Sequence, residues 1–167
     1  MKIKRRTPWV TDGANEFLKN YINRNSVVLE FGIGGSTIWF ADKVKKLVSI
    51  EHNKAWFHII KKELAKRRNI ELILHETEQI GDTDYIKSCY AREIDKFPDE
   101  YFDLVLVDGR NRVNCFKNSD RVLKTGGYMM LDNSDREELK EVYDFYKDKE
   151  YFESSQRPDW KTSWWKK

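Results

Sequence analysis

Short apolar runs alternate with stretches of helical periodicity along most of this chain, and this alternation limits its fold more than any other feature. The runs are rich in Val, Leu and Ile. Continuous apolar strands of this kind are buried on both faces, as in a parallel sheet. We expect strands at 26–31, 46–51, 70–75, 101–108 and 128–133. Because helical patterns separate them, the chain is predicted to form βαβ units within an α/β fold.

The two ends of the chain depart from this alternation. Residues 14–22 form a helical pattern ahead of the first strand. At the other end, YFESSQ and KTSWWK flank Arg157, Pro158 and Asp159, which indicates a turn between two strands. The two segments are too close for a helical crossover, so we expect them to pair as an antiparallel hairpin.

Length and composition favour one compact domain. The chain has 167 residues, of which 40% are hydrophobic and 14% aromatic. This apolar content is enough for one core, and disorder is not expected. We therefore predict a single domain over residues 1–167, with an N-terminal helix segment at 1–24 and the sheet-containing core at 25–167.

Charge and cysteine content limit the expected binding partners and the expected cellular location. The formal net charge is +3, which is too small to indicate nucleic-acid binding, and the basic cluster at 61–68 is interpreted as a solvated helix face. Cys89 and Cys115 provide neither a disulfide framework nor a metal-binding spacing, so a reducing, cytoplasmic location is expected. No apolar stretch is long enough for a membrane-spanning helix, and no membrane partner is expected.

The turn after the first strand, LEFGIGGST at 29–37, combines glycines with an acidic residue. Glycine lets the backbone approach a ligand closely, and the helix that follows offers free N–H groups. Open parallel sheets bind ligands beyond the carboxyl ends of their strands, near this point. Glu51 ends the second strand, where its carboxylate can accept hydrogen bonds from both hydroxyls of a ribose. A nucleoside cofactor is therefore expected.

Two cofactors fit such a turn, and the sequence favours one of them. A dinucleotide fingerprint G-x-G-x-x-G that starts at Gly32 has Gly34 in place, but its third glycine falls on Thr37. The carboxylate of Glu30 is also a poor neighbour for a pyrophosphate and suits a cationic ligand. S-adenosylmethionine carries a sulfonium and an ammonium group but no phosphate, so it is preferred over NAD.

Four segments taken together resemble the class I S-adenosylmethionine-dependent methyltransferases: LEFGIGGSTIWFA, SIEHNKAW, FDLVLVDGRNRV and LKTGGYMMLDNSDR. The resemblance covers about residues 7 to 165 and is nearest to small, single-domain members. It implies a Rossmann-like, seven-stranded, mostly parallel sheet with helices on both faces and an antiparallel C-terminal hairpin strand. It also implies an enzyme that transfers a methyl group.

The resemblance further implies a set of cofactor contacts. The residues implied around the methionine part are Glu30, Gly32, Gly34 and Gly35. Glu51 falls on the ribose, and Glu76, just past the third strand, falls near the adenine. Ser36 stands where many members have another glycine, and it is included in the expected site together with Asp108 at the end of the fourth strand.

The residues after the fourth strand bear on the methyl acceptor. Amide or adenine nitrogen methylation calls for Asn-Pro-Pro-Tyr or Asp-Pro-Pro-Tyr there, but the chain has VDGR at 107–110. Asp108 is the candidate base, while Arg110 and Asn133 are candidate substrate contacts. Arg110 and Arg112 suit an anionic acceptor. Four aromatic residues are candidates for the pocket wall: Trp9, Tyr85, Trp160 and Trp164.

Three polar side chains at neighbouring strand ends suggest a metal site. Asp108 ends the fourth strand, and Asp132 and Asn133 end the fifth. Two carboxylates and an amide oxygen suit Mg²⁺, and the layout is similar to that of catechol-type O-methyltransferases. The alternative is that Asp108 bonds to its own turn while Asp132 and Asn133 cap the next helix.

The sequence therefore predicts methyl transfer from S-adenosylmethionine to a small-molecule acceptor at oxygen, with or without Mg²⁺. The alternatives are a nucleic-acid or protein methyltransferase, a binding module without catalysis, and an NAD-dependent oxidoreductase. No specific nucleic-acid partner is expected. The acceptor site is either open or completed by a homodimer.

Overall fold

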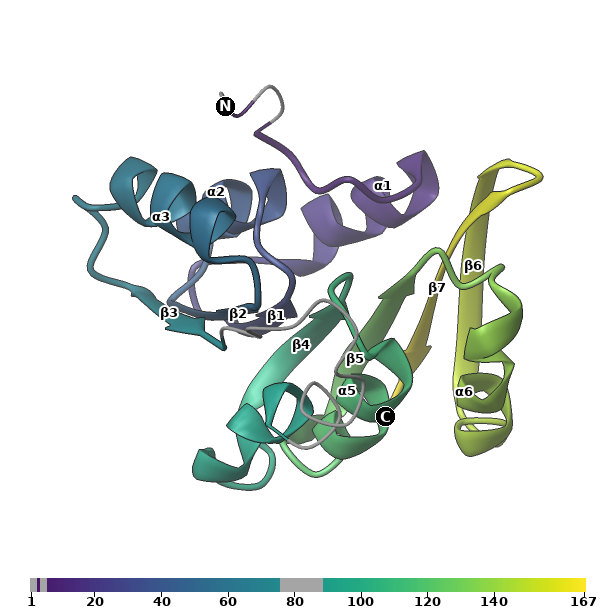
Figure 1. Cartoon of the computed structure of the whole chain (residues 1–167). Helices are drawn as coiled ribbons and strands as arrows, with labels where there is room; N and C mark the ends of the chain where they lie inside the picture. The colour runs from purple at the N-terminus through teal and green to yellow at the C-terminus, as the bar shows by residue number, and fades with distance from the viewer. Residues whose placement is uncertain (1–2, 4–5, 76–88) are drawn as a thin grey trace.

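A seven-stranded sheet forms the centre of the computed structural model, which describes residues 3, 6–75 and 89–167. The strands are β1 (Val27–Phe31), β2 (Lys46–Glu51), β3 (Ile70–Leu74), β4 (Phe102–Val107), β5 (Leu123–Asp132), β6 (Glu150–Arg157) and β7 (Trp160–Lys166). Their order is β3-β2-β1-β4-β5-β7-β6 (Figure 1). Strands β1 to β5 pair in parallel, whereas β7 is antiparallel to both β5 and β6. This arrangement confirms the predicted fold class.

Helices cover both faces of the sheet (Figure 1). They are α1 (Asp12–Tyr21), α2 (Gly35–Ala41), α3 (Lys54–Glu63), η1 (Tyr90–Lys96), α5 (Arg112–Ser119), η2 (Glu137–Leu139) and α6 (Lys140–Phe145). Alternate residues of a strand point to opposite faces. Val28 accordingly packs in the layer of α1, α2 and α3, while Leu29 and Phe31 pack in the layer of η1, α5 and α6. None of the described helices combines the length and apolarity needed to traverse a bilayer.

Strand β1 lies where the order of the sheet reverses, with β2 on one side and β4 on the other. The carboxyl ends of β1 and β4 approach very closely there. The backbone N–H of Asp108 donates to the carbonyl of Phe31 at 3.0 Å. A Cβ on Gly32, whose φ is +89°, would lie 2.9 Å from the Cα of Gly109. Only glycine fits this turn, so the crevice above these strand ends has a fixed floor.

The start of one predicted strand shifts for an identifiable reason. Strand β5 begins at Leu123 rather than near Tyr128, because Leu123 already pairs with Phe102 and the glycines at 126–127 are absorbed at a register shift. The segment between β5 and β6 contains two short helices, η2 and α6.

Candidate cofactor and acceptor site

A cavity of about 600 Å³ opens above the carboxyl ends of β1, β2 and β4. The glycine turn forms its floor, and residues after β2, after β4 and from the N-terminal segment form its walls. Its lining consists of Ile3, Thr7, Trp9, Gly32, Ile33, Gly34, Gly35, Ser36, Glu51, His52, Trp56, Asp108, Gly109, Arg110, Arg112 and Arg136. Most of the residues predicted from the sequence therefore meet in one place.

Glu30 lies beneath the glycine turn rather than on the cavity wall. Its side chain is fully buried, and its carboxylate accepts hydrogen bonds from the hydroxyls of Ser36, Thr37 (2.7 Å) and Ser49 (2.9 Å). The hydroxyl of Thr37 in turn accepts from the backbone N–H of Gly34 at 2.8 Å. Burial raises the pKa of Glu30 to about 7, although the three hydroxyls oppose this shift. Any effect of Glu30 on a ligand is therefore expected to act through the shape of the turn.

The glycines and Ser36 divide into two roles. Gly32 supports the close approach of β1 and β4, whereas a Cβ on Gly34 would meet no atom within 4 Å. Gly34, Gly35 and Ser36 line the cavity, but the hydroxyl of Ser36 is bound to Glu30. The turn consequently offers backbone rather than side-chain groups to a ligand.

Glu51 lines the cavity at the end of β2 and is firmly held by backbone groups. Its Oε1 accepts from the N–H groups of His52 (2.8 Å) and Asn53 (2.7 Å), and its Oε2 accepts from the N–H of Ile33 (3.0 Å). Burial alone would raise the pKa of Glu51, but hydrogen bonds from His52 and from these backbone groups lower it below its ordinary value. A carboxylate accepts about four hydrogen bonds, roughly two on each oxygen. Oε2 accepts one from the backbone, so it can accept another from a ribose hydroxyl.

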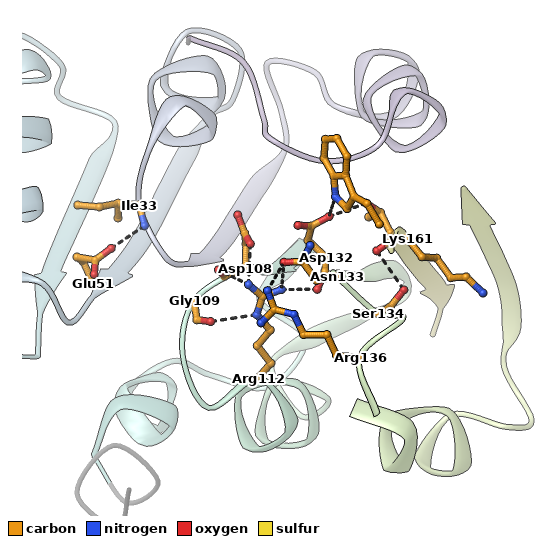
Figure 2. Close-up of polar contacts among 12 residues, drawn as sticks. Ile33, Glu51, Asp108, Gly109, Arg112, Asp132, Asn133, Ser134, Arg136 and Lys161 are labelled. Carbon is orange, nitrogen blue, oxygen red and sulfur yellow. Dashed lines mark hydrogen bonds and ion pairs between the residues drawn. The ribbon is translucent and has the colours of Figure 1, made fainter. Parts of the chain in front are cut away.

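Asp108 projects into the cavity from the end of β4 and pairs with Arg112 from the start of α5 (Figure 2). Nη2 of Arg112 donates a hydrogen bond to Oδ1 of Asp108 at 3.0 Å. Burial raises the pKa of Asp108 to about 7, while Arg112 opposes the shift and Asp132 and Glu30 add to it. The side chain of Asp108 remains 32% exposed, so a ligand can reach its carboxylate.

The predicted metal triad is not formed. Asp132 turns its carboxylate toward β7, where Oδ1 accepts from Thr162 (2.7 Å) and from the indole N–H of Trp160 (3.2 Å). The guanidinium of Arg112 lies between the two strand ends, bonded to Asp108 and, at 3.2 Å, to Oδ1 of Asn133 (Figure 2). No group of three His, Cys, Asp or Glu side chains within the described ranges is placed to hold an ion. The residues present therefore do not fit Mg²⁺, because a fixed cation already occupies its predicted place.

Of the two predicted substrate contacts, only one lines the cavity. Arg110 lines the cavity and is exposed. Oδ1 of Asn133 accepts from both Arg112 and Arg136, and Asn133 is not among the lining residues. Asn133 therefore holds two arginines and is not itself placed to contact a ligand.

The aromatic residues predicted for the pocket wall lie in different places. Trp9 lines the cavity, whereas Trp164 is buried in the core and Trp160 bonds to Asp132. The predictions for Glu76 and Tyr85 lie outside the described residues.

Among the lining residues that were not predicted from the sequence, three bring an aromatic ring or a positive charge to the site. His52 and Trp56 bring aromatic rings to the cavity from the segment after β2, and Arg136 reaches it from the segment after β5. Asn53 caps α3 by accepting from the N–H of Trp56 at 2.9 Å, which sets the start of that helix. The recognisable cap could have indicated that Trp56 lies within one turn of the strand end. Arg136 lies within the LDNSDR segment, three residues after Asn133, and this spacing was its available signal.

Searches of protein-family models and of curated proteins give no match to this chain. Solved structures do match it. A methyltransferase-like protein from Silicibacter pomeroyi has a TM-score of 0.70 and 22% identity, over 97% of this chain and 89% of that one. TYW2 of M. jannaschii in complex with AdoMet has a TM-score of 0.61 and 17% identity, over 95% of this chain and 77% of that one.

A tRNA methyltransferase from Aquifex aeolicus also matches, with a TM-score of 0.65 and 13% identity, over 99% of this chain and 71% of that one. This chain spans less of some larger matched proteins, such as 48% of the YcgJ protein of Bacillus subtilis. All these identities are low, so the likenesses establish the fold alone. This chain has the fold found in S-adenosylmethionine-dependent methyltransferases.

Proposed function

We propose that this chain transfers a methyl group from S-adenosylmethionine to an oxygen atom of a small-molecule acceptor. The observation that carries the proposal is the single cavity shared by the glycine turn, Glu51 and Asp108. Its volume of about 600 Å³ lies within the range of small-molecule sites. The likeness in fold to a structure that holds AdoMet supports the choice of cofactor.

The chemistry of the lining fits this cofactor. The pKa of Glu51 is lowered, so the carboxylate is ionised at neutral pH and offers its open Oε2 position to a ribose hydroxyl. His52 and Trp56 line the same cavity with aromatic rings, which suit an adenine. When bound, the cofactor supplies its methyl group from a positively charged sulfonium. The ionised carboxylate of Glu51 on the cavity wall favours such a cation.

Asp108 is the group placed to handle a proton from the acceptor. In the transfer, a hydroxyl oxygen forms a bond to the methyl carbon, the carbon–sulfur bond breaks, and the hydroxyl proton must leave. The pKa of about 7 makes the Asp108 carboxylate a base matched to neutral pH. Arg112 binds Oδ1 and fixes the side chain, and Oδ2 makes no hydrogen bond to any described residue. Oδ2 is thus the atom expected to accept the proton.

Calorimetry with S-adenosylhomocysteine, S-adenosylmethionine and NAD tests the cofactor. We expect the first two to bind and NAD not to bind. Glu51→Ala should weaken S-adenosylhomocysteine binding by about 1–3 kcal/mol, because a polar partner of the ribose is lost. Glu138→Ala, at an exposed position away from the cavity, is the matched control. Tight NAD binding without a response to the other two ligands would overturn the proposal.

A screen of hydroxyl-bearing acceptors, monitored by release of S-adenosylhomocysteine, tests the reaction. Asp108→Asn should lower kcat by about 10²- to 10⁴-fold, while S-adenosylhomocysteine still binds. In the unmodified protein kcat should rise with pH through about 7, since the base must be deprotonated. Because Arg112 occupies the predicted ion position, EDTA should leave turnover unchanged. A kcat that Asp108→Asn does not alter would remove Asp108 from the reaction.

The same screen separates the alternatives. Likeness in fold to a tRNA methyltransferase motivates the inclusion of RNA and protein acceptors. Turnover confined to those macromolecules would contradict a small-molecule acceptor. A module without catalysis would bind S-adenosylhomocysteine and release none with any acceptor.

A further inference from the structure

The charged groups that line the cavity are not equally available to a ligand. The side chain of Arg112 is only 10% exposed, and it donates to Asp108, Gly109, Asp132 and Asn133. All three of its guanidinium nitrogens are engaged in these bonds. Arg112 is therefore a structural cation that neutralises the strand ends, and it is not free to bind an anion.

Arg110 and Arg136 are in the opposite situation. Both are exposed and both line the cavity. Over the part of the chain that the structure describes, the guanidinium of Arg110 makes no hydrogen bond or ion pair. That of Arg136 has one neutral partner, Oδ1 of Asn133 at 3.0 Å. A guanidinium has five N–H donors, so the two side chains offer several unused donors to the same space.

Trp9 adds an apolar surface to the same cavity. It is 67% exposed, the largest value among the exposed large hydrophobic residues of the described chain, which also include Phe145 and Tyr151. Of these three, Trp9 alone lines the cavity. An indole left in water at the wall of a cavity suits a flat apolar ligand that covers it.

We propose that the methyl acceptor carries an anionic group, a carboxylate or a phosphate, that binds between Arg110 and Arg136 while its apolar body packs on Trp9. The inference rests on the proposed function, since it describes the acceptor of that reaction. Guanidinium groups bind carboxylate and phosphate oxygens in pairs of charge-assisted hydrogen bonds. Two arginines that line the same cavity, and that form no ion pair with any described residue, thus select an anion, and Trp9 selects its apolar part.

The carboxylate of the cofactor is a second source of the same chemistry, so the test must separate the two sources. S-adenosylhomocysteine has this carboxylate and 5′-methylthioadenosine does not. If the two arginines bind the acceptor, Arg110→Gln and Arg136→Gln leave the affinities for both compounds unchanged. A tenfold or greater loss of S-adenosylhomocysteine affinity, with methylthioadenosine affinity unchanged, would assign the arginines to the cofactor and overturn the proposal.

Benzoate and inorganic phosphate are probes for the anion, and benzamide is the neutral counterpart of benzoate. They are titrated into protein saturated with S-adenosylhomocysteine, and backbone amide shifts of Arg110 and Arg136 are followed by NMR. Benzoate should bind with millimolar affinity and benzamide roughly tenfold more weakly. Arg110→Gln and Arg136→Gln should each weaken benzoate about tenfold or more. Trp9→Ala should weaken both benzoate and benzamide.

Arg68→Gln is the matched control, because it removes one exposed guanidinium away from the cavity. It should leave benzoate binding unchanged. Equal binding of benzoate and benzamide, or no binding of benzoate and phosphate at about 50 mM, would overturn the anionic acceptor. A protein that binds no S-adenosylhomocysteine would instead remove the proposed function and this inference together, so the two failures are distinguishable.

Discussion

Glu30 and Glu51 are buried carboxylates on adjacent strands whose surroundings shift their pKa values in opposite directions. Burial raises the pKa of Glu30 to about 7 against the opposing hydrogen bonds of its hydroxyl partners, whereas hydrogen bonds from His52 and from backbone N–H groups lower the pKa of Glu51 in spite of its burial. N–H groups can only donate, so they stabilise a charged carboxylate, while a hydroxyl can also accept a bond from a protonated acid. The cavity therefore has an ionised carboxylate on its wall and a second one beneath its floor that exchanges a proton near neutral pH.

The raised pKa of Glu30 predicts a pH-dependent cost to stability. Between the usual glutamate pKa of 4.5 and about 7, the folded state binds more protons at this site than the unfolded state. The contribution of Glu30 to stability should therefore fall as pH rises through this window and stay constant above it. Glu30→Gln removes this contribution, so the difference in unfolding free energy between wild type and variant should fall by roughly 3 kcal/mol across the window.

Urea unfolding between pH 4 and pH 8 measures this difference. Glu138→Gln, at an exposed site, should keep the pH dependence of the wild type. If Glu30→Gln also keeps it, the pKa of Glu30 is not raised.

At the scale of elements, the site depends on how closely β1 and β4 meet. Gly32→Ala would place a methyl group 2.9 Å from backbone atoms of Gly109, at a residue with φ of +89°. Gly126→Ala would meet the same backbone strain, with φ of +81°, but no atom within 4 Å. Gly32→Ala should thus destabilise the protein by about 1–3 kcal/mol more than Gly126→Ala, because it also pushes two strand ends apart.

Urea unfolding and S-adenosylhomocysteine calorimetry on both variants check this expectation. Cofactor affinity should fall in Gly32→Ala and persist in Gly126→Ala, which lies in β5 away from the cavity. Equal losses of stability in the two variants would show that the contact between the strand ends does not stabilise the protein.

Elements were more predictable from the sequence than the bonding at their ends. The apolar runs fix β1, β2 and β4 because burial on both faces leaves little choice of residue. The role of Arg112 could not be predicted in the same way. Its partner Asn133 is 21 positions away in sequence, and their contact exists only once β4 and β5 are side by side. The metal hypothesis failed at this point, because the sequence shows which strand ends meet and not which cation lies between them.

At the scale of the whole molecule, two groups of basic residues bear on nucleic-acid binding. Arg110, Arg112 and Arg136 line the cavity, while the basic cluster at 61–68 lies at the end of α3 and just beyond it. Arg67 of that cluster is paired with Asp42, and the formal net charge of the chain is only +3. The three arginines thus line a cavity of small-molecule size, while the cluster at 61–68 belongs to a helix end.

This division predicts weak and nonspecific nucleic-acid binding. Binding to labelled RNA or DNA should have a Kd of roughly 10⁻⁴–10⁻⁶ M at physiological salt, and it should weaken steeply between about 50 and 200 mM salt, because only phosphate contacts are available. Fluorescence anisotropy with several unrelated sequences measures both quantities. Lys61→Gln combined with Lys62→Gln should lower this affinity and leave S-adenosylhomocysteine binding intact, since both lysines lie outside the cavity. Nanomolar, sequence-dependent binding at physiological salt would contradict the prediction and favour a nucleic-acid acceptor, because specificity of that order requires contacts to bases.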